Sequence, residues 1–346
     1  MYSVAFIGCG KPWRSEGATG FGMSHAHAEG YKLSPDCKIT ALADIVEENA
    51  RAFMERHGGE RVYTDYHKML AEEKPDIVSI STWPHLHAPM VIDVAQAGVK
   101  AIHCEKPMAP TFGEARRMVE ICEKNGVQLT FNHQRRFGKP FRKVKELLKA
   151  GAIGELQRME ALCDNMIDWG THWYDMLNFF NDETPVEWLI GQIEGRGSKK
   201  VFGLWVEGQG VSWFQYKNGV QGMLLTGQGS GGGAKIRLIG SGGMLEVGGF
   251  PAQVQLFNGE SNGWQSVEHG ETEGDLQWVS RGVLDLVEAL KKGREPELSA
   301  RRALAGTELI FATYESSRRR GRVDLPLQIN DSPYLSMIES GEMKTE

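Results

Sequence analysis

Short apolar runs alternate with amphipathic segments through the first part of the chain. Two segments of helical periodicity are each followed by a glycine, as helix ends commonly are: Glu47 to Arg56 and Pro89 to Ala97. The apolar runs between such segments predict five buried strands: Val4 to Ile7, Lys38 to Ala43, Asp76 to Ile80, Ala101 to Cys104 and Val127 to Asn132. This alternation predicts a parallel sheet with right-handed crossovers and helices on both faces.

The pattern changes after Lys139 and becomes rich in strands from about Leu156. Asn218-Gly219 is a strong hairpin signal, and two helices are expected near the end, over Leu276 to Lys291 and Ala300 to Arg320. Short runs between glycine turns predict strands over Lys200 to Val206, Val211 to Tyr216, Gly222 to Thr226, Lys235 to Ile239 and Gly243 to Val247. We therefore predict an α/β domain over residues 1–131 and an α+β domain with a large, mostly antiparallel open sheet over residues 132–346.

Composition and charge narrow the class of protein. The chain has 346 residues, of which 41% are hydrophobic and 24% are charged, as in an ordinary soluble globular protein. Its net charge of −6 gives no general attraction to nucleic acid or to an anionic membrane. No apolar run approaches the ~20 residues that span a bilayer, and no signal peptide is recognisable at the start. Five cysteines without a C-x-x-C pair indicate reduced thiols, so we expect a cytoplasmic protein.

A glycine turn, Gly8-Cys9-Gly10, directly follows the first predicted strand. A Rossmann dinucleotide-binding domain has its phosphate-binding turn at this place. The third glycine of that motif is expected at position 13, where Trp13 stands instead. We interpret Lys11 to Phe21 as containing an insertion, after which Gly22 serves as the helix-packing glycine. Asp44, at the end of the second strand, can accept hydrogen bonds from the adenosine ribose and would repel a 2′-phosphate, which favours NAD over NADP.

Further motifs carry a resemblance to a known family. They are Thr82-Trp83-Pro84-His85-Leu86-His87, Glu105-Lys106-Pro107, His133-Gln134-Arg135-Arg136-Phe137, Gly151-Ala152-Ile153-Gly154-Glu155, Asp168-Trp169-Gly170-Thr171-His172 with Asp175, and the segment from Gly240 to Glu246. Together with the glycine turn, they resemble the Gfo/Idh/MocA family, which is named after glucose-fructose oxidoreductase, inositol dehydrogenase and rhizopine catabolism. The resemblance runs in order over nearly the whole chain, and it implies an oxidoreductase with a substrate-binding and oligomerisation domain after the Rossmann domain.

The chemistry of alcohol oxidation suits three of these residues. A base must take the hydroxyl proton, and a hydrogen-bond donor must stabilise the developing oxyanion. His172 suits the first task because the ordinary pKa of a histidine is ~6.5, and Lys106 suits the second as a cation at the carboxyl end of a strand. At ~100° per residue, Asp168, His172 and Asp175 share one helix face, which we expect to look into a cleft. The resemblance implies the same trio, Lys106, Asp168 and His172.

Other positions are expected to contact ligands. The candidate cofactor contacts are Gly8, Gly10, Gly22, Asp44, Thr82, Trp83, His87, Glu105, Lys106 and Pro107. The candidate substrate contacts are Trp13, Arg136, Trp169 and Asp175, with an arginine that braces the interdomain linker as an equal interpretation of Arg136. His25 and His27 are assigned to packing around the first helix. No metal site is expected, because no third ligand has suitable spacing to Asp168 and His172.

Three functions follow from these residues. The first is an NAD-dependent dehydrogenase that transfers a hydride between nicotinamide and a secondary hydroxyl of a sugar, sugar derivative or cyclitol. The second is an NAD-retaining enzyme that cleaves glycosides by transient oxidation and elimination, with the same Lys106 and His172. The third is a non-catalytic NAD-binding sensor. Relatives commonly associate through the open sheet, so a homodimer or homotetramer is expected, with no nucleic-acid or membrane partner.

Overall fold

The computed structural model describes residues 1–227, 235–260, 263–272 and 274–346, and the chain divides into two compact units. The first unit comprises Met1–Pro110, Glu114–Gln134 and Asp275–Ala303, and the second comprises Thr111–Gly113, Arg135–Gly274 and Leu304–Glu346. The segment Asp275–Ala303 therefore groups with the first unit, whereas the sequence pattern placed it in the second domain.

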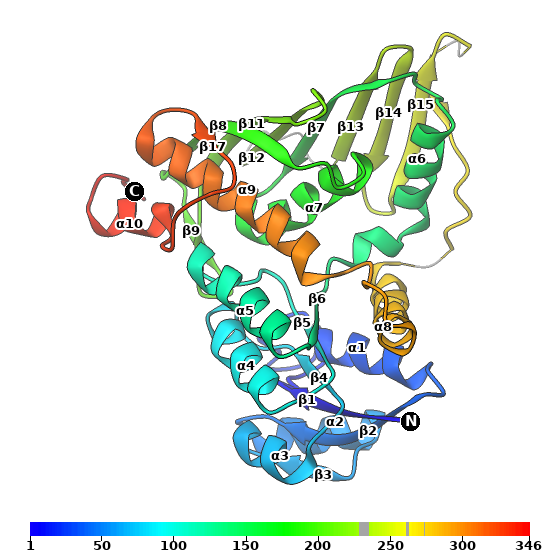
Figure 1. Ribbon diagram of the computed structural model, residues 1–346, viewed down its shortest axis with the longest axis vertical. Helices are drawn as coiled ribbons and strands as arrows, with labels where there is room; N and C mark the ends of the chain where they lie inside the picture. The colour runs from blue at the N-terminus through cyan, green and yellow to red at the C-terminus, as the bar shows by residue number, and fades with distance from the viewer. Residues whose placement is uncertain (228–234, 261–262, 273) are drawn as a thin grey trace. The chain divides into compact units, whose positions relative to one another are not determined.

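The first unit contains a parallel six-stranded sheet in the order β3-β2-β1-β4-β5-β6 (Figure 1). Its strands are β1 (Tyr2–Ile7), β2 (Cys37–Ala43), β3 (Arg61–Tyr63), β4 (Ile77–Ile80), β5 (Ala101–Cys104) and β6 (Gln128–Phe131). The five predicted strands are confirmed, and each is an apolar run buried in the sheet. The pattern missed β3, because three residues are too few to show a periodicity.

Six helices accompany this sheet: α1 (Met23–Lys32), α2 (Glu47–His57), α3 (Tyr66–Glu73), α4 (Pro84–Gln96), α5 (Phe112–Lys124) and α8 (Asp275–Lys292). The first and last of them, α1 and α8, pack closely together. A Cβ on Gly30 of α1 would lie 2.8 Å from the Cβ of Val283 in α8, so only glycine permits this approach. Val283, Leu286 and Val287 share one buried core with Val4 of β1. This burial explains why Asp275–Ala303 belongs to the first unit.

The second unit contains a nine-stranded sheet in the order β16-β15-β14-β13-β7-β12-β11-β8-β17. Its strands are β7 (Leu156–Cys163), β8 (Val186–Glu194), β11 (Gln209–Tyr216), β12 (Gln221–Gly227), β13 (Lys235–Gly240), β14 (Gly243–Gly248), β15 (Gln253–Asn258), β16 (Gln265–Ser266) and β17 (Val323–Asp324). Only the β7–β12 pair of this described sheet is parallel. The predicted mostly antiparallel open sheet is confirmed.

One predicted strand is wrong. The run from Lys200 to Val206 forms two strands, β9 (Lys199–Val201) and β10 (Leu204–Val206), which pair as a separate two-stranded sheet. Phe202 and Gly203 turn the chain between them with φ angles of 49° and 82°. Glycine adopts such angles readily, so Gly203 was the signal for this turn.

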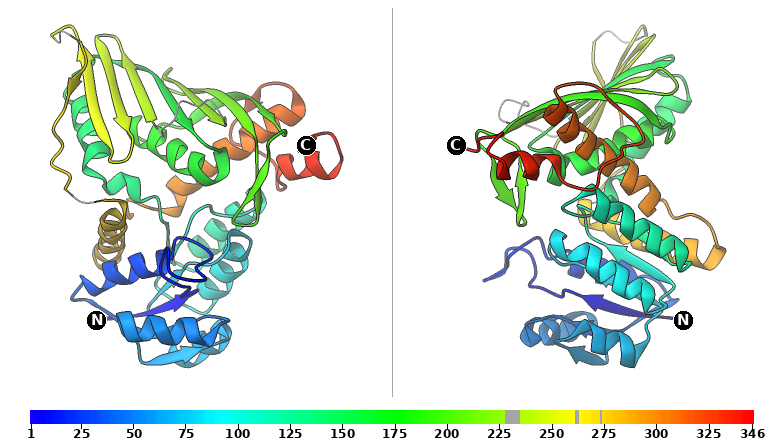
Figure 2. Two further views of the ribbon diagram at one scale, coloured as in Figure 1. Left: turned by 180° about the vertical axis from the view of Figure 1, so that it is seen from behind. Right: turned by 60° about the vertical axis from the view of Figure 1, so that its left-hand side comes forward.

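Helices cover one face of the nine-stranded sheet (Figure 2). They are α6 (Lys139–Lys149), α7 (Thr171–Phe180) and α9 (Ala300–Arg319), while α10 (Pro333–Glu339) lies near the C-terminus. Strand β11 shows why the two faces differ: Ser212, Phe214 and Tyr216 are buried, whereas Val211 and Trp213 are exposed. Among the described residues, none of the helices combines the length and apolarity needed to cross a membrane.

Candidate functional site

The glycine turn lies at the carboxyl end of β1, and two of its residues need left-handed backbone angles. Gly8 has a φ of 84°, and a Cβ there would lie 2.6 Å from the carbonyl oxygen of Ser81. Gly10 has a φ of 57°, and nothing lies within 4 Å of the position of its Cβ. Gly8 therefore packs against the segment after β4, whereas Gly10 borders open space. Such a glycine lets a phosphate approach the backbone closely.

Asp44 follows β2 and holds this turn. Its Oδ2 accepts hydrogen bonds from the backbone N–H groups of Cys9 and Gly10, both at 2.9 Å. Its Oδ1 accepts one from the N–H of Val46, also at 2.9 Å. The predicted ribose-binding carboxylate and the glycine turn thus meet at one edge of the sheet. A carboxylate oxygen has two lone-pair sites, so these bonds leave acceptor capacity for a ligand.

The inserted segment leaves the turn after Gly10 and returns at Gly22, the residue before α1. Gly22 has a φ of 60°, and a Cβ there would lie 2.7 Å from the carbonyl oxygen of Lys11. It therefore packs against the inserted segment itself, while Gly30 provides the close helix contact. Trp13 is 51% exposed and lies beside Phe21, with the ring centroids 5.9 Å apart and the ring planes tilted by 52°, and the Arg14 guanidinium lies 4.0 Å over its ring.

His87 joins two loops at the same edge of the sheet. It is fully buried in α4; its Nδ1 lies 2.9 Å from the carbonyl oxygen of Pro107, and its Nε2 lies 3.1 Å from that of Thr82. Burial lowers the pKa of His87, which favours the neutral ring. Trp83, the residue before α4, is 39% exposed. His87 therefore braces the loop after β4 against the Glu105-Lys106-Pro107 loop after β5.

Glu105 is the centre of a buried polar network. Its Oε1 accepts hydrogen bonds from His27 Nε2 at 2.9 Å and from Asn132 Nδ2 at 2.7 Å. Its Oε2 accepts the backbone N–H of Lys106 at 3.2 Å. Burial alone would raise the pKa of Glu105, but the hydrogen bonds from His27 and Asn132 and the nearby charge of Lys106 together outweigh it and lower the pKa. The carboxylate thus stays ionised and fixes the start of the lysine loop.

His27 was assigned to helix packing from the sequence, and the structure gives it a more specific place. Its ring spans from Glu105 to Ser79 of β4, whose Oγ lies 2.8 Å from Nδ1. Asn132, which follows β6, was not identified as a candidate at all. No sequence signal joins these positions, because their contacts span 27 to 78 residues along the chain.

A second histidine of α1, His25, forms a pair that sequence reasoning also missed. His25 Nδ1 lies 2.8 Å from Nε2 of His57, and His57 Nδ1 lies 3.1 Å from a carboxylate oxygen of Glu29. Burial and the neighbouring His25 lower the pKa of His57 to about 4. Burial likewise lowers the pKa of His25, which lies beside the backbone of Gly10. The neutral form of both rings is therefore favoured, and His25 is the one that lies next to the glycine turn.

In the second unit, Asp168 and His172 lie on one continuous helical segment, which is not a regular α-helix. Asp168 belongs to a π-helix, η2 (Met166–Gly170), and His172 is the second residue of α7. Asn165 caps this segment, since its Oδ1 accepts the backbone N–H of Asp168 at 2.8 Å. The predicted single helix face is therefore interrupted by a π-turn, a feature frequent at functional sites. Both side chains are largely buried.

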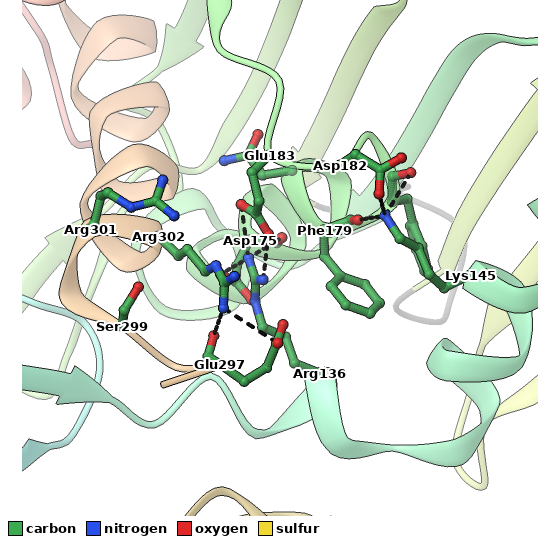
Figure 3. A network of polar contacts seen from close by, with 12 residues as sticks. Arg136, Lys145, Asp175, Phe179, Asp182, Glu183, Glu297, Ser299, Arg301 and Arg302 are labelled. Carbon is green, nitrogen blue, oxygen red and sulfur yellow. Dashed lines mark hydrogen bonds and ion pairs between the residues drawn. The ribbon is translucent and has the colours of Figure 1, made fainter. Parts of the chain in front are cut away.

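Asp175 does not face a cleft as expected, because Arg136 pairs with it (Figure 3). The fully buried guanidinium donates to both carboxylate oxygens of Asp175, at 2.8 and 2.9 Å, and to Glu183 Oε1 at 2.5 Å. Two parallel N–H···O bonds to one carboxylate are the strongest geometry for such a pair. The structure thus gives Arg136 a bracing role within the second unit and makes Asp175 its partner.

Trp169, the fourth substrate candidate, lies among aromatic and cationic groups. Its ring meets Phe250 edge-on at 5.8 Å, and the Arg135 guanidinium lies 5.5 Å from its centroid. The same guanidinium lies 5.0 Å from the buried ring of Trp173. Within the described residues, no group of three His, Cys, Asp or Glu side chains is arranged to hold a metal ion.

Comparison with known proteins agrees with this arrangement. Residues 2–133 match the sequence model of a family described as "Oxidoreductase family, NAD-binding Rossmann fold". D-apiose dehydrogenase of Paraburkholderia graminis is 26% identical over 384 residues, which cover 99% of this chain and 95% of that protein. Myo-inositol 2-dehydrogenase of Thermotoga maritima is 33% identical over 140 residues, which cover 40% of this chain and 42% of that protein.

A solved structure shows the same fold over nearly the whole length. The WlbA dehydrogenase from Bordetella pertussis, crystallised with NADH and UDP-GlcNAcA, superimposes with a TM-score of 0.74. The match covers 94% of this chain and 99% of that chain, at 22% sequence identity. Both units therefore have a counterpart in that structure.

Proposed function

Because the chain belongs to the Gfo/Idh/MocA family of NAD-binding oxidoreductases, we propose that it is a dehydrogenase of sugars, sugar derivatives or cyclitols. It transfers a hydride between a secondary hydroxyl of the substrate and nicotinamide. The observation that carries this proposal is the carboxyl edge of the parallel sheet, where Asp44 binds the glycine turn after β1 and where the lysine loop follows β5. Ligands of such sheets bind outside the carboxyl ends of the strands.

The residues at this edge fit a dinucleotide. Gly8 has no room for a side chain, while the half-buried Gly10 has nothing within 4 Å of its Cβ position, which leaves space for a diphosphate to approach the backbone. We expect Asp44, Thr82, Trp83 and the lysine loop to contact the rest of the cofactor. The charge of Asp44 disfavours a 2′-phosphate, and Ile45-Val46-Glu47-Glu48 supply no cation to offset it. The enzyme therefore prefers NAD, and a higher kcat/KM with NADP than with NAD would contradict this assignment.

Three residues have different roles in the proposed reaction. When bound, the nicotinamide supplies the acceptor for the hydride. His172 takes the hydroxyl proton as general base, and it returns the proton in the reverse direction. Lys106 stabilises the negative charge that develops on the substrate oxygen. Asp168 accepts hydrogen bonds from substrate hydroxyls and couples electrostatically to His172 or Lys106.

The proposed substrate class is supported by the names of related enzymes and by side chains that suit the binding of sugars. The names of two relatives refer to D-apiose, a sugar, and to myo-inositol, a cyclitol, and both molecules carry secondary hydroxyls. Aromatic faces such as those of Trp13 and Trp169 pack well against the C–H faces of sugar rings. Carboxylates and amides hydrogen-bond the hydroxyls. A panel of aldoses, glycosides and inositols covers this class.

We also propose that the enzyme is a homodimer or homotetramer. Large side chains exposed on the uncovered face of the nine-stranded sheet support this: Ile190, Val211, Trp213 and Leu225. Contiguous exposed apolar surface of this kind commonly marks an interface. Trp213→Glu should lower the mass measured by light scattering. A monomeric wild type would contradict the proposal.

The experiment for the function is net formation of NADH with the substrate panel. A dehydrogenase accumulates NADH, whereas an enzyme that oxidises its substrate transiently does not, and a sensor forms none. His172→Ala and Lys106→Ala should each lower kcat by about 10²- to 10⁴-fold, the typical contribution of a positioned acid–base or oxyanion group. Near-normal turnover by His172→Ala would contradict the assigned base.

A further inference from the structure

Glu207 is a buried carboxylate that the proposed reaction does not use. It follows β10, is 3% exposed, and accepts hydrogen bonds from three segments of the second unit. Its Oε1 accepts the backbone N–H of Met166 at 2.7 Å and the hydroxyl of Thr226 in β12 at 2.8 Å. Its Oε2 accepts the hydroxyl of Tyr314 in α9 at 2.8 Å. One side chain thus ties a strand, a helix and a turn together.

These three donors are electrically neutral, so they compensate the charge only in part. Burial raises the pKa of Glu207 despite the hydrogen bonds from Thr226 and Tyr314, which shows that the charged form is disfavoured at this place. A buried carboxylate without a cationic partner lowers stability relative to a neutral side chain of the same shape. Stability alone therefore gives no reason for an acid at this position.

The geometry of the turn supplies a reason. Met166 is the first residue of the π-helix η2, which ends at Gly170 and leads directly into α7. Glu207 fixes the N–H of Met166, and Asn165 fixes the N–H of Asp168 two residues later. The first turn of a helix leaves its N–H groups without backbone partners, so side-chain acceptors decide where that turn lies. A negative charge there is also favoured by the helix dipole.

We propose that Glu207 is a positioning residue, which holds the π-turn so that Asp168 and His172 keep their catalytic placement. This inference rests on the proposed function of Asp168 and His172. The charge matters because a carboxylate is a stronger acceptor than an amide, by roughly a factor of two for such hydrogen bonds. Small displacements of a positioned group lower turnover steeply, by up to about 10²-fold for about 1 Å.

Two variants of this cluster separate positioning from simple stability. Glu207→Gln keeps the shape and an acceptor but weakens the bond to Met166. Tyr314→Phe removes only the hydroxyl on the other carboxylate oxygen and leaves the Met166 bond in place. Tyr314→Phe should lower the urea midpoint of unfolding, whereas Glu207→Gln, which removes the buried charge, should not. Only Glu207→Gln should lower kcat, by about 10-fold, with the KM for NAD unchanged.

A second measurement needs no activity. Hydrogen–deuterium exchange of the holoenzyme, followed in peptides that span residues 164–172, reports how firmly the π-turn is held. Exchange there should be faster in Glu207→Gln than in Tyr314→Phe and the wild type. Equal exchange, or an equal kcat in the two variants, would overturn the proposal. If the wild type oxidises no polyol and the exchange difference is present, the proposed function fails while the anchoring of the turn stands.

Discussion

Alanine substitutions at the glycines of the first turn distinguish an effect on the stability of the fold from an effect on cofactor binding. Gly10→Ala places a methyl group where nothing lies within 4 Å, at a φ of 57°. Gly98, which follows α4 closely, provides a matched control, because it has a φ of 84° and equally open surroundings. A left-handed backbone costs a residue with a Cβ about 1–2 kcal/mol. Both variants should therefore lose about this much stability.

Gly8→Ala should behave differently from both. Its methyl group would lie 2.6 Å from the Ser81 carbonyl oxygen and 2.8 Å from Cγ2 of Thr82, and the first of these is backbone that cannot move aside freely. Overpacking of this kind adds about 1–3 kcal/mol to the conformational cost. We expect a total loss of about 2–5 kcal/mol, measured as the change in free energy of unfolding in urea.

Isothermal titration with NAD completes the comparison. Gly98→Ala should bind NAD like the wild type, whereas Gly10→Ala should bind at least about tenfold more weakly, a difference of about 1.4 kcal/mol. The reason is that only the methyl group at position 10 occupies the expected path of the diphosphate. Wild-type affinity in Gly10→Ala, with the stability loss present, would refute the placement of the cofactor at this turn.

Three further predictions follow from the contacts described above. Arg136→Ala leaves the carboxylates of Asp175 and Glu183 without their cation, so the free energy of unfolding should fall by about 3–5 kcal/mol; a loss near zero would contradict the bracing role. The folded pKa of His57 lies at about 4, below its ordinary value of ~6.5. Stability should therefore be intact above pH ~6.5 and decline as the pH falls from there towards 4, because only the unfolded chain takes up the proton in that range. His57→Asn should flatten this decline in urea midpoints measured across the range, and an unchanged slope would count against it. Shortening Lys11–Phe21 to two residues restores the regular glycine spacing and should raise the KM for NAD or for the sugar. If both KM values stay unchanged, the loop does not contribute to either binding site.

The fold was largely predictable because buried strands are continuous apolar runs. β1, β2, β4, β5 and β6 all have this form, and the glycine turn and Asp44 mark the edge of their sheet. The prediction was wrong or incomplete where a strand is short or where a turn divides an apolar run. β3 has three residues, and the turn at Phe202 and Gly203 splits a run that reads as one strand.

The polar framework around the site was not predictable for a different physical reason. Its bonds join residues far apart in the chain, such as His27 with Glu105, and Glu207 with Met166. Asp175 illustrates the same limit. Its helix position suggested a side chain facing a cleft, but the guanidinium of Arg136, 39 residues earlier, occupies both of its oxygens. Periodicity predicts which face a residue occupies and does not predict its partner.

The most direct test of the central claim is the accumulation of reduced nicotinamide when purified enzyme and NAD are mixed with the polyol panel. We expect one NADH to form for each substrate molecule oxidised with at least one sugar or cyclitol, and this formation to be lost in His172→Ala and Lys106→Ala. Contradiction would come from the absence of NADH with every member of the panel, or from equal rates in the wild type and His172→Ala.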